Sequence, residues 1–168
     1  MLEAACATCD HYIDVAAADG VPYWDAGAPG VAALMAAGGP ADPFNDREPV
    51  DSSAAAIAAQ GLLRLGRVLQ QRNHRGADRY LQAGLRVLDT ILATPYLSED
   101  DSHQGLLLHS VYHWPNRWDH VPAGANTPRG ESSQWGDYHL REAALYVKRL
   151  IDDGPYLTFF AAGSRQPR

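Results

Sequence analysis

The sequence contains a single lysine, Lys148, and its formal net charge is −6 at pH 7 with neutral histidines. A nucleic-acid-binding protein needs a stripe of Lys and Arg side chains that neutralises phosphates, and no such stripe is present. The composition therefore predicts no nucleic-acid partner. It also provides no general attraction for an acidic ligand, so local groups would have to hold an anion.

Long apolar runs are also lacking. No run approaches the ~18–20 residues needed to span a bilayer. The first residues, MLEAACATCDHY, show no basic segment followed by an apolar one. We therefore expect no membrane partner, no secretory signal and a cytoplasmic setting. A hydrophobic share of 46% with 20% charged residues is typical of a soluble globular protein, and 168 residues fit one domain.

Cysteine is scarce, with only Cys6 and Cys9 in a C-x-x-C spacing. A structural zinc site needs four ligands, and no second Cys pair exists. A thioredoxin-like redox pair should follow a strand, and nothing upstream could form one. The spacing favours a third interpretation, a buried helix face, because the two cysteines share an apolar row with Leu2, Ala5, Ile13 and Ala16.

Apolar periodicity predicts four helices, over residues 2–17, 52–71, 77–93 and 137–151. Asp51 is the expected N-cap of the second helix. The second and third helices are joined by the short polar turn RNHRG, which predicts an antiparallel helical hairpin. The third helix carries two adjacent apolar rows, so we expect a wide face of it to be covered.

Two connections, 18–50 and 94–136, are much longer than the usual ~2–8 residues between packed helices. Loops of this length in a compact helical protein are usually functional or disordered, and their aromatic content argues against disorder. Within the second loop, 103–112 is apolar and fits either a strand or a helical turn. The tail GSRQPR, from Gly163, is expected to be unstructured.

Polar aromatic residues crowd one part of the chain. Five of the seven histidines and three of the four tryptophans fall between residues 103 and 139. This crowding predicts a cleft, although the same residues could instead pack the loop onto the helices. A sugar-binding site suits them best, since carbohydrate rings stack on Trp and Tyr while His, Asp and Glu take up hydroxyls. Arg117 and Arg129 could pair with the carboxylate of an acidic sugar.

Motifs for other chemistries are absent. His109 and His113 have the spacing of a zinc pair, but Ser110 stands where a metalloprotease needs glutamate. There is no G-x-S-x-G elbow, phosphate loop or dinucleotide fingerprint. An aromatic wall could raise the pKa of a nearby carboxyl group into the range of a general acid. The candidate carboxylates are Asp25, Asp51, Asp119, Glu131 and Asp137, of which Asp51 and Asp137 stand at helix starts and suit capping better.

Four motifs stand out in chain order: DGVPYWD at 19–25, DSSAAAIAAQGLLRL at 51–65, GLLLHSVYHWPN at 105–116 and GESSQWGDYHLREAAL at 130–145. Together they resemble the C-terminal half of the unsaturated glucuronyl hydrolases. The resemblance implies an all-α fold in which helical hairpins form about half of an α/α toroid of six hairpins, with long aromatic-rich loops. Residues 1–162 would form this portion, and 163–168 a disordered tail.

This family of glycosidases removes the unsaturated uronic acid that polysaccharide lyases leave on oligosaccharides. The implied chemistry is hydration, in which a carboxylic acid protonates the C4=C5 vinyl ether, water adds at C5 and the hemiketal collapses. The resemblance implies no metal, no cofactor and no covalent intermediate, unlike the retaining two-carboxylate scheme. The tyrosine of the W-G-D-Y motif carries over to Tyr138 as a substrate-binding residue. The further candidates are Trp135, His109, His113 and Arg129.

The departures from the family are large. Its catalytic aspartates lie in the N-terminal half, and its W-S-R-G-Q-A-W motif is also unmatched, so no catalytic residue is assigned here. At ~30–50 residues a hairpin, the chain supplies about three of six. Whether it is an enzyme stays open. It could be a fragment that pairs with a missing N-terminal half, a non-catalytic carbohydrate-binding or assembly module that self-associates, or a fragment of an unsaturated rhamnogalacturonyl hydrolase.

Overall fold

The computed structural model describes residues 1–155, and within them the chain is helical and contains no strand. Two isolated antiparallel bridges occur, Tyr23 with Val50 and Leu97 with Leu107. The all-α class predicted from the sequence is confirmed. The unstructured tail expected from Gly163 lies outside the described residues. The helices are α1 (Leu2–Val15), α2 (Val31–Met35), α3 (Ser52–Gln71), α4 (Ala77–Ile91) and α5 (Gln134–Ile151), with a 3₁₀ turn at Trp114–Asn116.

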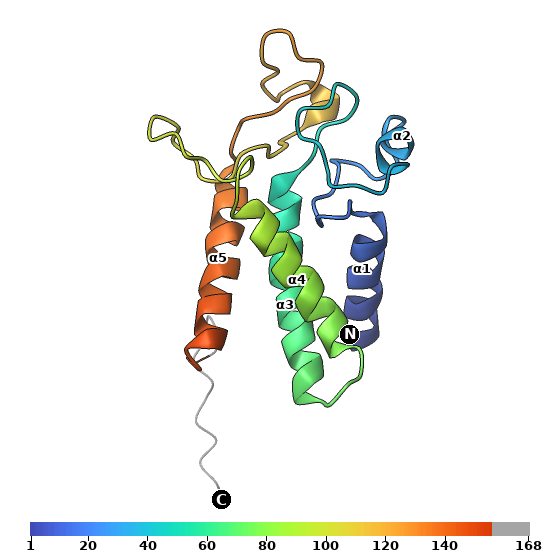
Figure 1. Cartoon of the computed structure of the whole chain (residues 1–168), viewed down its shortest axis with the longest axis vertical. Helices are drawn as coiled ribbons and strands as arrows, with labels where there is room; N and C mark the ends of the chain where they lie inside the picture. The colour runs from blue at the N-terminus through green and yellow to red at the C-terminus, as the bar shows by residue number, and fades with distance from the viewer. Residues whose placement is uncertain (156–168) are drawn as a thin grey trace, which may run out of the picture.

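The long helices run alternately up and down, and the two long loops gather at one end of them (Figure 1). α3 and α5 both begin at this loop end, whereas α1 and α4 end there. The four-helix prediction is confirmed, and the predicted bounds of α3 match those observed. α1 and α4 each end two residues earlier than predicted.

α5 begins at Gln134, three residues before the predicted start. The reason is the N-cap Ser133, whose hydroxyl accepts a hydrogen bond from the backbone N–H of Gly136 at 3.1 Å. At the start of α3 the expected cap is confirmed, since the Asp51 side chain accepts from the backbone N–H groups of Ser53 and Ala54. Trp135 is therefore in the first turn of α5.

α3 and α4 form the predicted hairpin, and glycine allows their close approach. A Cβ atom on Gly84 would lie 2.9 Å from Leu63 Cγ, and one on Gly66 would lie 2.5 Å from Leu81 Cγ. α5 packs on the other side of α3. The core that results contains Leu62, Leu63, Leu69, Tyr80, Val87, Ile91, Leu140 and Ala143.

The two apolar rows of α4 differ in burial. Tyr80, Gly84, Val87 and Ile91 are all buried, as expected. In the other row, Leu85 is 39% exposed and Leu92 is 40% exposed, so the covered face of α4 is narrower than the sequence predicted.

Cys6 and Cys9 are both free thiols that lie half-buried on α1 and pack against the core. Burial raises the pKa of the Cys9 thiol, which disfavours the reactive thiolate. No group of three or more His, Cys, Asp or Glu side chains within residues 1–155 could hold a metal ion. The cysteines therefore pack against the core, as their spacing favoured, but this face of α1 is only half-buried and not buried as predicted.

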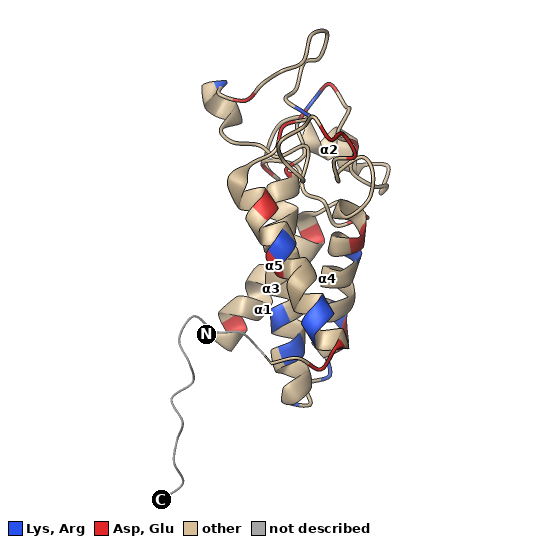
Figure 2. Ribbon diagram, turned by 90° about the vertical axis from the view of Figure 1, so that its left-hand side faces the viewer, with Lys and Arg blue, Asp and Glu red and all other residues tan. Residues whose placement is uncertain are grey.

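Acidic and basic side chains are interspersed along the helices (Figure 2). Arg79 of α4, for example, contacts Asp10 at 2.9 Å and Asp14 at 3.5 Å on α1. Among the helices formed by residues 1–155, none is long and apolar enough to cross a membrane.

Candidate functional site

The first turns of α3 and α5 are joined at the loop end by a short chain of hydrogen bonds. The indole Nε1 of Trp135 donates to Ser53 Oγ at 3.0 Å, and Ser53 Oγ donates to Asp51 Oδ1 at 2.6 Å. Burial raises the pKa of the Asp51 carboxyl, and the hydrogen bond from the Ser53 hydroxyl opposes that shift. Asp51 thus caps one helix and, through Ser53, orients an aromatic side chain of another.

Three aspartates hold the backbone of residues 106–113. Asp137 accepts from the amides of Leu106 and Leu107 at 2.8–3.1 Å. Asp51 accepts from the Val111 amide at 3.3 Å. Asp119 accepts from the amides of Tyr112 and His113. The undecided segment 103–112 is therefore neither strand nor helix, because carboxylates take the hydrogen bonds that a regular ladder would use.

An open cleft of 620 Å³ lies between residues 103–105, residues 131–134 and the first turns of α5. His103 Nε2 and Ser132 Oγ lie 3.0 Å apart across it. A Cβ atom on Gly105 would lie only 2.2 Å from the Ser132 Cβ, so glycine is needed for this approach. The cleft is lined by His103, Gln104, Gly105, Glu131, Ser132, Ser133, Gln134, Asp137, Tyr138 and Arg141.

Tyr138 lines this cleft and is 58% exposed. No hydrogen bond to its hydroxyl is found among the described residues, and the same holds for the guanidinium of Arg141. Of the two acidic side chains in the cleft, Asp137 is held by backbone amides, whereas Glu131 is exposed and has no such partner. The cleft therefore offers an aromatic face, a free cation and a free carboxylate.

Trp135 belongs to an exposed group of rings, which we call the aromatic patch: Tyr112, His113, Trp118 and Trp135. The ring centroids of Tyr112 and Trp118 are 5.7 Å apart, and those of Tyr112 and Trp135 are 5.6 Å apart. His113 lies 5.2 Å from Trp118. Two of the predicted site residues, Trp135 and His113, thus belong to one group of rings, and Tyr138 follows Trp135 by three residues on α5.

His109 lies elsewhere, inside the loop packing, where its side chain is only 4% exposed. Its Nδ1 accepts from the Gly130 amide at 3.3 Å, and its ring makes edge contacts with Phe44 and Tyr96. Burial lowers the pKa of His109 to about 4, with a hydrogen bond to Pro95 opposing the shift and the charge of Arg129 adding to it. A neutral, buried His109 joins loops and does not reach the cleft.

Arg129 also joins loops. Its Nη1 donates to the Phe44 carbonyl at 2.9 Å, and its guanidinium lies 5.6 Å from the Phe44 ring centroid. Arg117 lies over the Trp114 ring at 3.9 Å. Neither arginine lines the cleft. The cation that does so is Arg141, which the motif analysis missed although it follows Tyr138 by three residues, the spacing of neighbours on one helix face.

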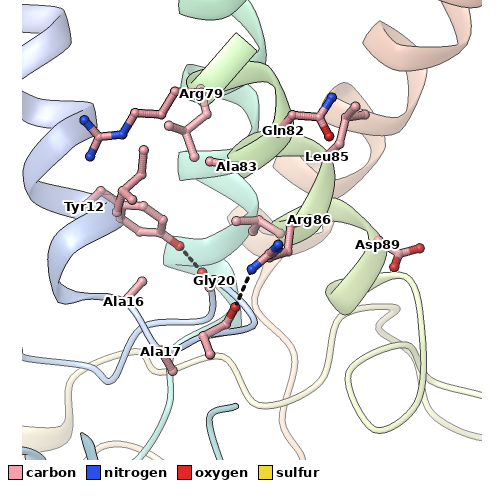
Figure 3. Close-up of a pocket in the computed structure, with 14 residues that line it drawn as sticks. Tyr12, Ala16, Ala17, Gly20, Arg79, Gln82, Ala83, Leu85, Arg86 and Asp89 are labelled. Carbon is pink, nitrogen blue, oxygen red and sulfur yellow. Dashed lines mark hydrogen bonds between the residues drawn. The ribbon is translucent and has the colours of Figure 1, made fainter. Parts of the chain in front are cut away.

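A groove of 770 Å³ lies between α1 and α4 (Figure 3). Two of its polar groups bond to the protein itself: the Tyr12 hydroxyl donates to the Gly20 carbonyl at 2.6 Å, and Arg86 donates to the Ala18 carbonyl at 3.3 Å. None of the residues predicted from the sequence lines this groove. We therefore place the candidate site at the smaller cleft and the aromatic patch.

Comparisons with known proteins point to one family. No protein-family model matches the chain. It is 30% identical over 138 residues to an unsaturated glucuronyl hydrolase of Formosa agariphila, covering 79% of this chain and 26% of the relative. A Bacillus sp. (strain GL1) enzyme of the same name is 29% identical over 152 residues, covering 90% of this chain and 34% of the relative.

Solved structures agree with these sequences. The crystal structure of the Bacillus sp. GL1 enzyme, described as responsible for glycosaminoglycan degradation, matches 89% of this chain and 33% of its own at a TM-score of 0.65 and 28% identity. A solved complex of a UGL variant with dGlcA-Glc-Rha-Glc matches 89% of this chain and 33% of its own, at a TM-score of 0.64 and 28% identity. The crystal structure of an unsaturated glucuronyl hydrolase specific for heparin matches 90% of this chain and 34% of its own, at a TM-score of 0.65. Because the two sequences are only 22% identical, this match supports the fold alone.

The resemblance found in the motifs is therefore confirmed, and the helices form part of an α/α toroid. The chain spans about a quarter to a third of the length of these relatives. Its share of the toroid was expected to be about half, and the matched share of the solved relative is 33%.

Proposed function

Because the chain is similar to unsaturated glucuronyl hydrolases over most of its length, we propose that it is part of a glycoside hydrolase that releases unsaturated uronic acid from lyase-generated oligosaccharides. The observation that carries this proposal is Tyr138. It stands in the W-G-D-Y motif, is 58% exposed and lines the cleft at the start of α5. An exposed aromatic face beside free polar groups suits a sugar ring.

The cleft residues divide into separate roles. The Tyr138 ring stacks against the unsaturated sugar, with Trp135 beside it. Arg141 and the N-terminal end of α5 favour its carboxylate, because a guanidinium pairs with carboxylates and a helix N-terminus attracts negative charge. His113 of the aromatic patch hydrogen-bonds to hydroxyls. His109 and Arg129 act indirectly, since their contacts fix the loops that border the site.

The acid that protonates C4 of the vinyl ether comes from outside the matched segment in this proposal. Three of the aspartates near the site already accept two or more hydrogen bonds from backbone amides. The relatives are three to four times longer than the matched segment. The chain therefore supplies part of the substrate wall, and the region that corresponds to the rest of the relatives' length completes the site.

The exposed edges of the helices support such pairing. Large apolar side chains are 37–78% exposed at Leu85 of α4, at Leu92 directly after α4, and at Leu145, Leu150 and Ile151 of α5. Apolar surface of this kind marks an interaction site or an aggregation liability. Covering it with further hairpins, or with a second copy of the chain, removes it from water. Light scattering distinguishes a monomer from self-association.

A cytoplasmic setting also stays part of the proposal.

The test is loss of the vinyl-ether absorbance of an unsaturated chondroitin disaccharide. The chain is assayed alone and then with the part of the Bacillus enzyme that it does not match. We expect loss of absorbance only in the mixture. Loss with the chain alone would show that its own carboxylates suffice, and Glu131→Gln would then be the first variant. If neither sample reacts and neither binds the disaccharide, the proposal fails.

A second candidate is a non-catalytic carbohydrate-binding module. The observation that favours it is the use of Asp51, Asp119 and Asp137 as backbone acceptors, which leaves Glu131 as the free carboxylate of the cleft. Such a module would bind the disaccharide without turnover in either sample. The rhamnogalacturonyl alternative is separated by using a lyase-generated rhamnogalacturonan disaccharide in the same assay.

A further inference from the structure

The aromatic patch extends beyond the residues that the W-G-D-Y motif points to. Tyr112 is 60% exposed and Trp118 is 61% exposed, and their rings are stacked at an interplanar angle of 27°. Both come from the loop after the buried segment 106–111, not from α5. Rings of this size usually bury most of their surface, so a stacked pair that stays open to solvent is available to a ligand.

Hydrogen bonds and a cation–π contact hold the backbone around the stacked pair. Both carboxylate oxygens of Asp119 accept hydrogen bonds from the backbone at Tyr112 and His113. The connection to Trp118 runs through the 3₁₀ turn Trp114–Asn116 and ends at Arg117, which has a left-handed backbone with φ 58°. The Arg117 guanidinium lies 3.9 Å over the Trp114 ring and fastens this turn. Little side-chain or loop ordering would be needed on binding.

The chemistry of the patch fits a sugar. Between residues 105 and 138, the exposed large apolar side chains are all aromatic: Tyr112, Trp118, Trp135 and Tyr138. Polar groups surround the stacked pair, with His113 at 5.2 Å from the Trp118 ring and Asp119 beneath. A pyranose presents a C–H face to such a ring and hydroxyls to the polar groups that border it.

We propose that Tyr112 and Trp118 form a second sugar-stacking surface, which holds a saccharide unit further along the oligosaccharide than the one at Tyr138. Trp135 connects the two places, because its ring lies 5.6 Å from Tyr112 and it precedes Tyr138 by one helical turn on α5. This inference rests on the proposed function only for the direction of the sugar chain. It gives the site a preference for ligands longer than a disaccharide.

The test uses two probes and calorimetric titration of the 168-residue chain. An unsaturated chondroitin disaccharide reaches only the Tyr138 cleft, and a saturated chondroitin hexasaccharide, which lacks the C4=C5 bond, reaches the stacked pair. Trp118→Ala and Tyr112→Ala should each weaken hexasaccharide binding about three- to tenfold, as the loss of one aromatic stacking contact. Each should weaken disaccharide binding by a smaller factor. Trp118→Phe and Tyr112→Phe keep a ring and should restore most of the affinity.

The outcomes separate the two proposals. If the hexasaccharide binds in a Trp118-dependent manner but the disaccharide neither binds nor reacts in the complementation assay, the stacking surface stands and the proposed hydrolase function fails. If the disaccharide binds but the alanine variants bind the hexasaccharide as the parent does, the stacking surface is overturned. Equal helical circular dichroism and equal melting midpoints of parent and variants show that folding is not the cause.

Discussion

Trp135 and Ser53 stand on different helices, and a hydrogen bond of 3.0 Å from the indole Nε1 to the Ser53 hydroxyl joins them. Ser53 is buried and donates in turn to Asp51. The orientation of an exposed ring in the candidate site therefore depends on a buried serine–aspartate pair at the start of α3.

We predict that Ser53→Ala lowers the free energy of unfolding by about 1–2 kcal/mol, because the indole N–H of Trp135 and the half-buried carboxylate of Asp51 each lose a partner. It should also shift the indole N–H resonance of Trp135 in a ¹H–¹⁵N spectrum. Ser102→Ala is the matched control, since Ser102 makes the same hydrogen bond to Asp100 on the exposed surface. An equal effect of the two substitutions would contradict the role given to Ser53.

Asp137→Asn should open the wall of the cleft. Both carboxylate oxygens accept from the Leu106 and Leu107 amides, whereas asparagine would turn an NH₂ donor toward one of these donors. We expect the free energy of unfolding to fall by about 1–3 kcal/mol. Hydrogen exchange at the Leu106 and Leu107 amides should become faster. Asp152→Asn, which removes an exposed charge paired with Lys148, should change stability by less than about 0.5 kcal/mol.

The pH dependence of stability should report His109. Its pKa in the folded protein is lowered to about 4, mainly by burial, while an unfolded histidine titrates near ~6.5. Between these values the unfolded chain binds more protons, so the contribution of His109 is complete above pH ~6.5 and is lost as the pH falls toward 4. The free energy of unfolding should therefore fall by about 2–3 kcal/mol over this pH range.

His109→Asn isolates this effect, because asparagine tolerates the left-handed backbone at φ 66° and does not titrate. Urea unfolding of parent and variant is compared at pH values from 7 to 4. The difference in unfolding free energy between the two proteins should shrink as the pH falls. A constant difference would mean that His109 is not buried in its neutral form.

Two glycines of the α3–α4 hairpin should respond oppositely to alanine. A Cβ atom on Gly84 would lie 2.9 Å from Leu63 Cγ and 3.0 Å from its backbone nitrogen, so Gly84→Ala should cost about 1–3 kcal/mol. Gly61 lies on the exposed face of α3, and a Cβ atom built on it would meet no neighbouring atom within 4 Å. Gly61→Ala should therefore raise the free energy of unfolding by about 0.5–1 kcal/mol through helix propensity. Urea midpoints of the two variants on opposite sides of the parent would confirm the packing.

The helices could be predicted from the sequence because their signals are local. The apolar spacing in α3 and the Asp51 cap gave its bounds. The serine cap of α5 and the short helix α2 were missed, and α1 and α4 were predicted two residues too long. The loops could not be predicted in the same way. The burial of His109 depends on Phe44, Tyr96 and Gly130, which are 13 to 65 positions away in the chain, and no periodic pattern links such residues.

Tyr138 and Trp135 were found through a motif, and the structure places both at the exposed loop end. Ser132 and Arg141 lie inside the 130–145 motif, and His103 lies in the histidine-rich segment, but nothing in the sequence assigned these three to the site. They line one cleft because Gly105 lets two loop segments meet. Arg129 was assigned to the ligand by its charge, and the structure shows that its charge is used by the Phe44 carbonyl.

Residues 106–113 are held through their main-chain amides, which donate hydrogen bonds to the carboxylates of Asp51, Asp119 and Asp137. The side chains of this loop take no part in these hydrogen bonds. The path of this loop is therefore largely independent of which side chains it displays. Exposed positions such as Tyr112 and His113 can be exchanged while the backbone keeps its course, so a new ligand preference could be selected, or engineered, without rebuilding the scaffold beneath it.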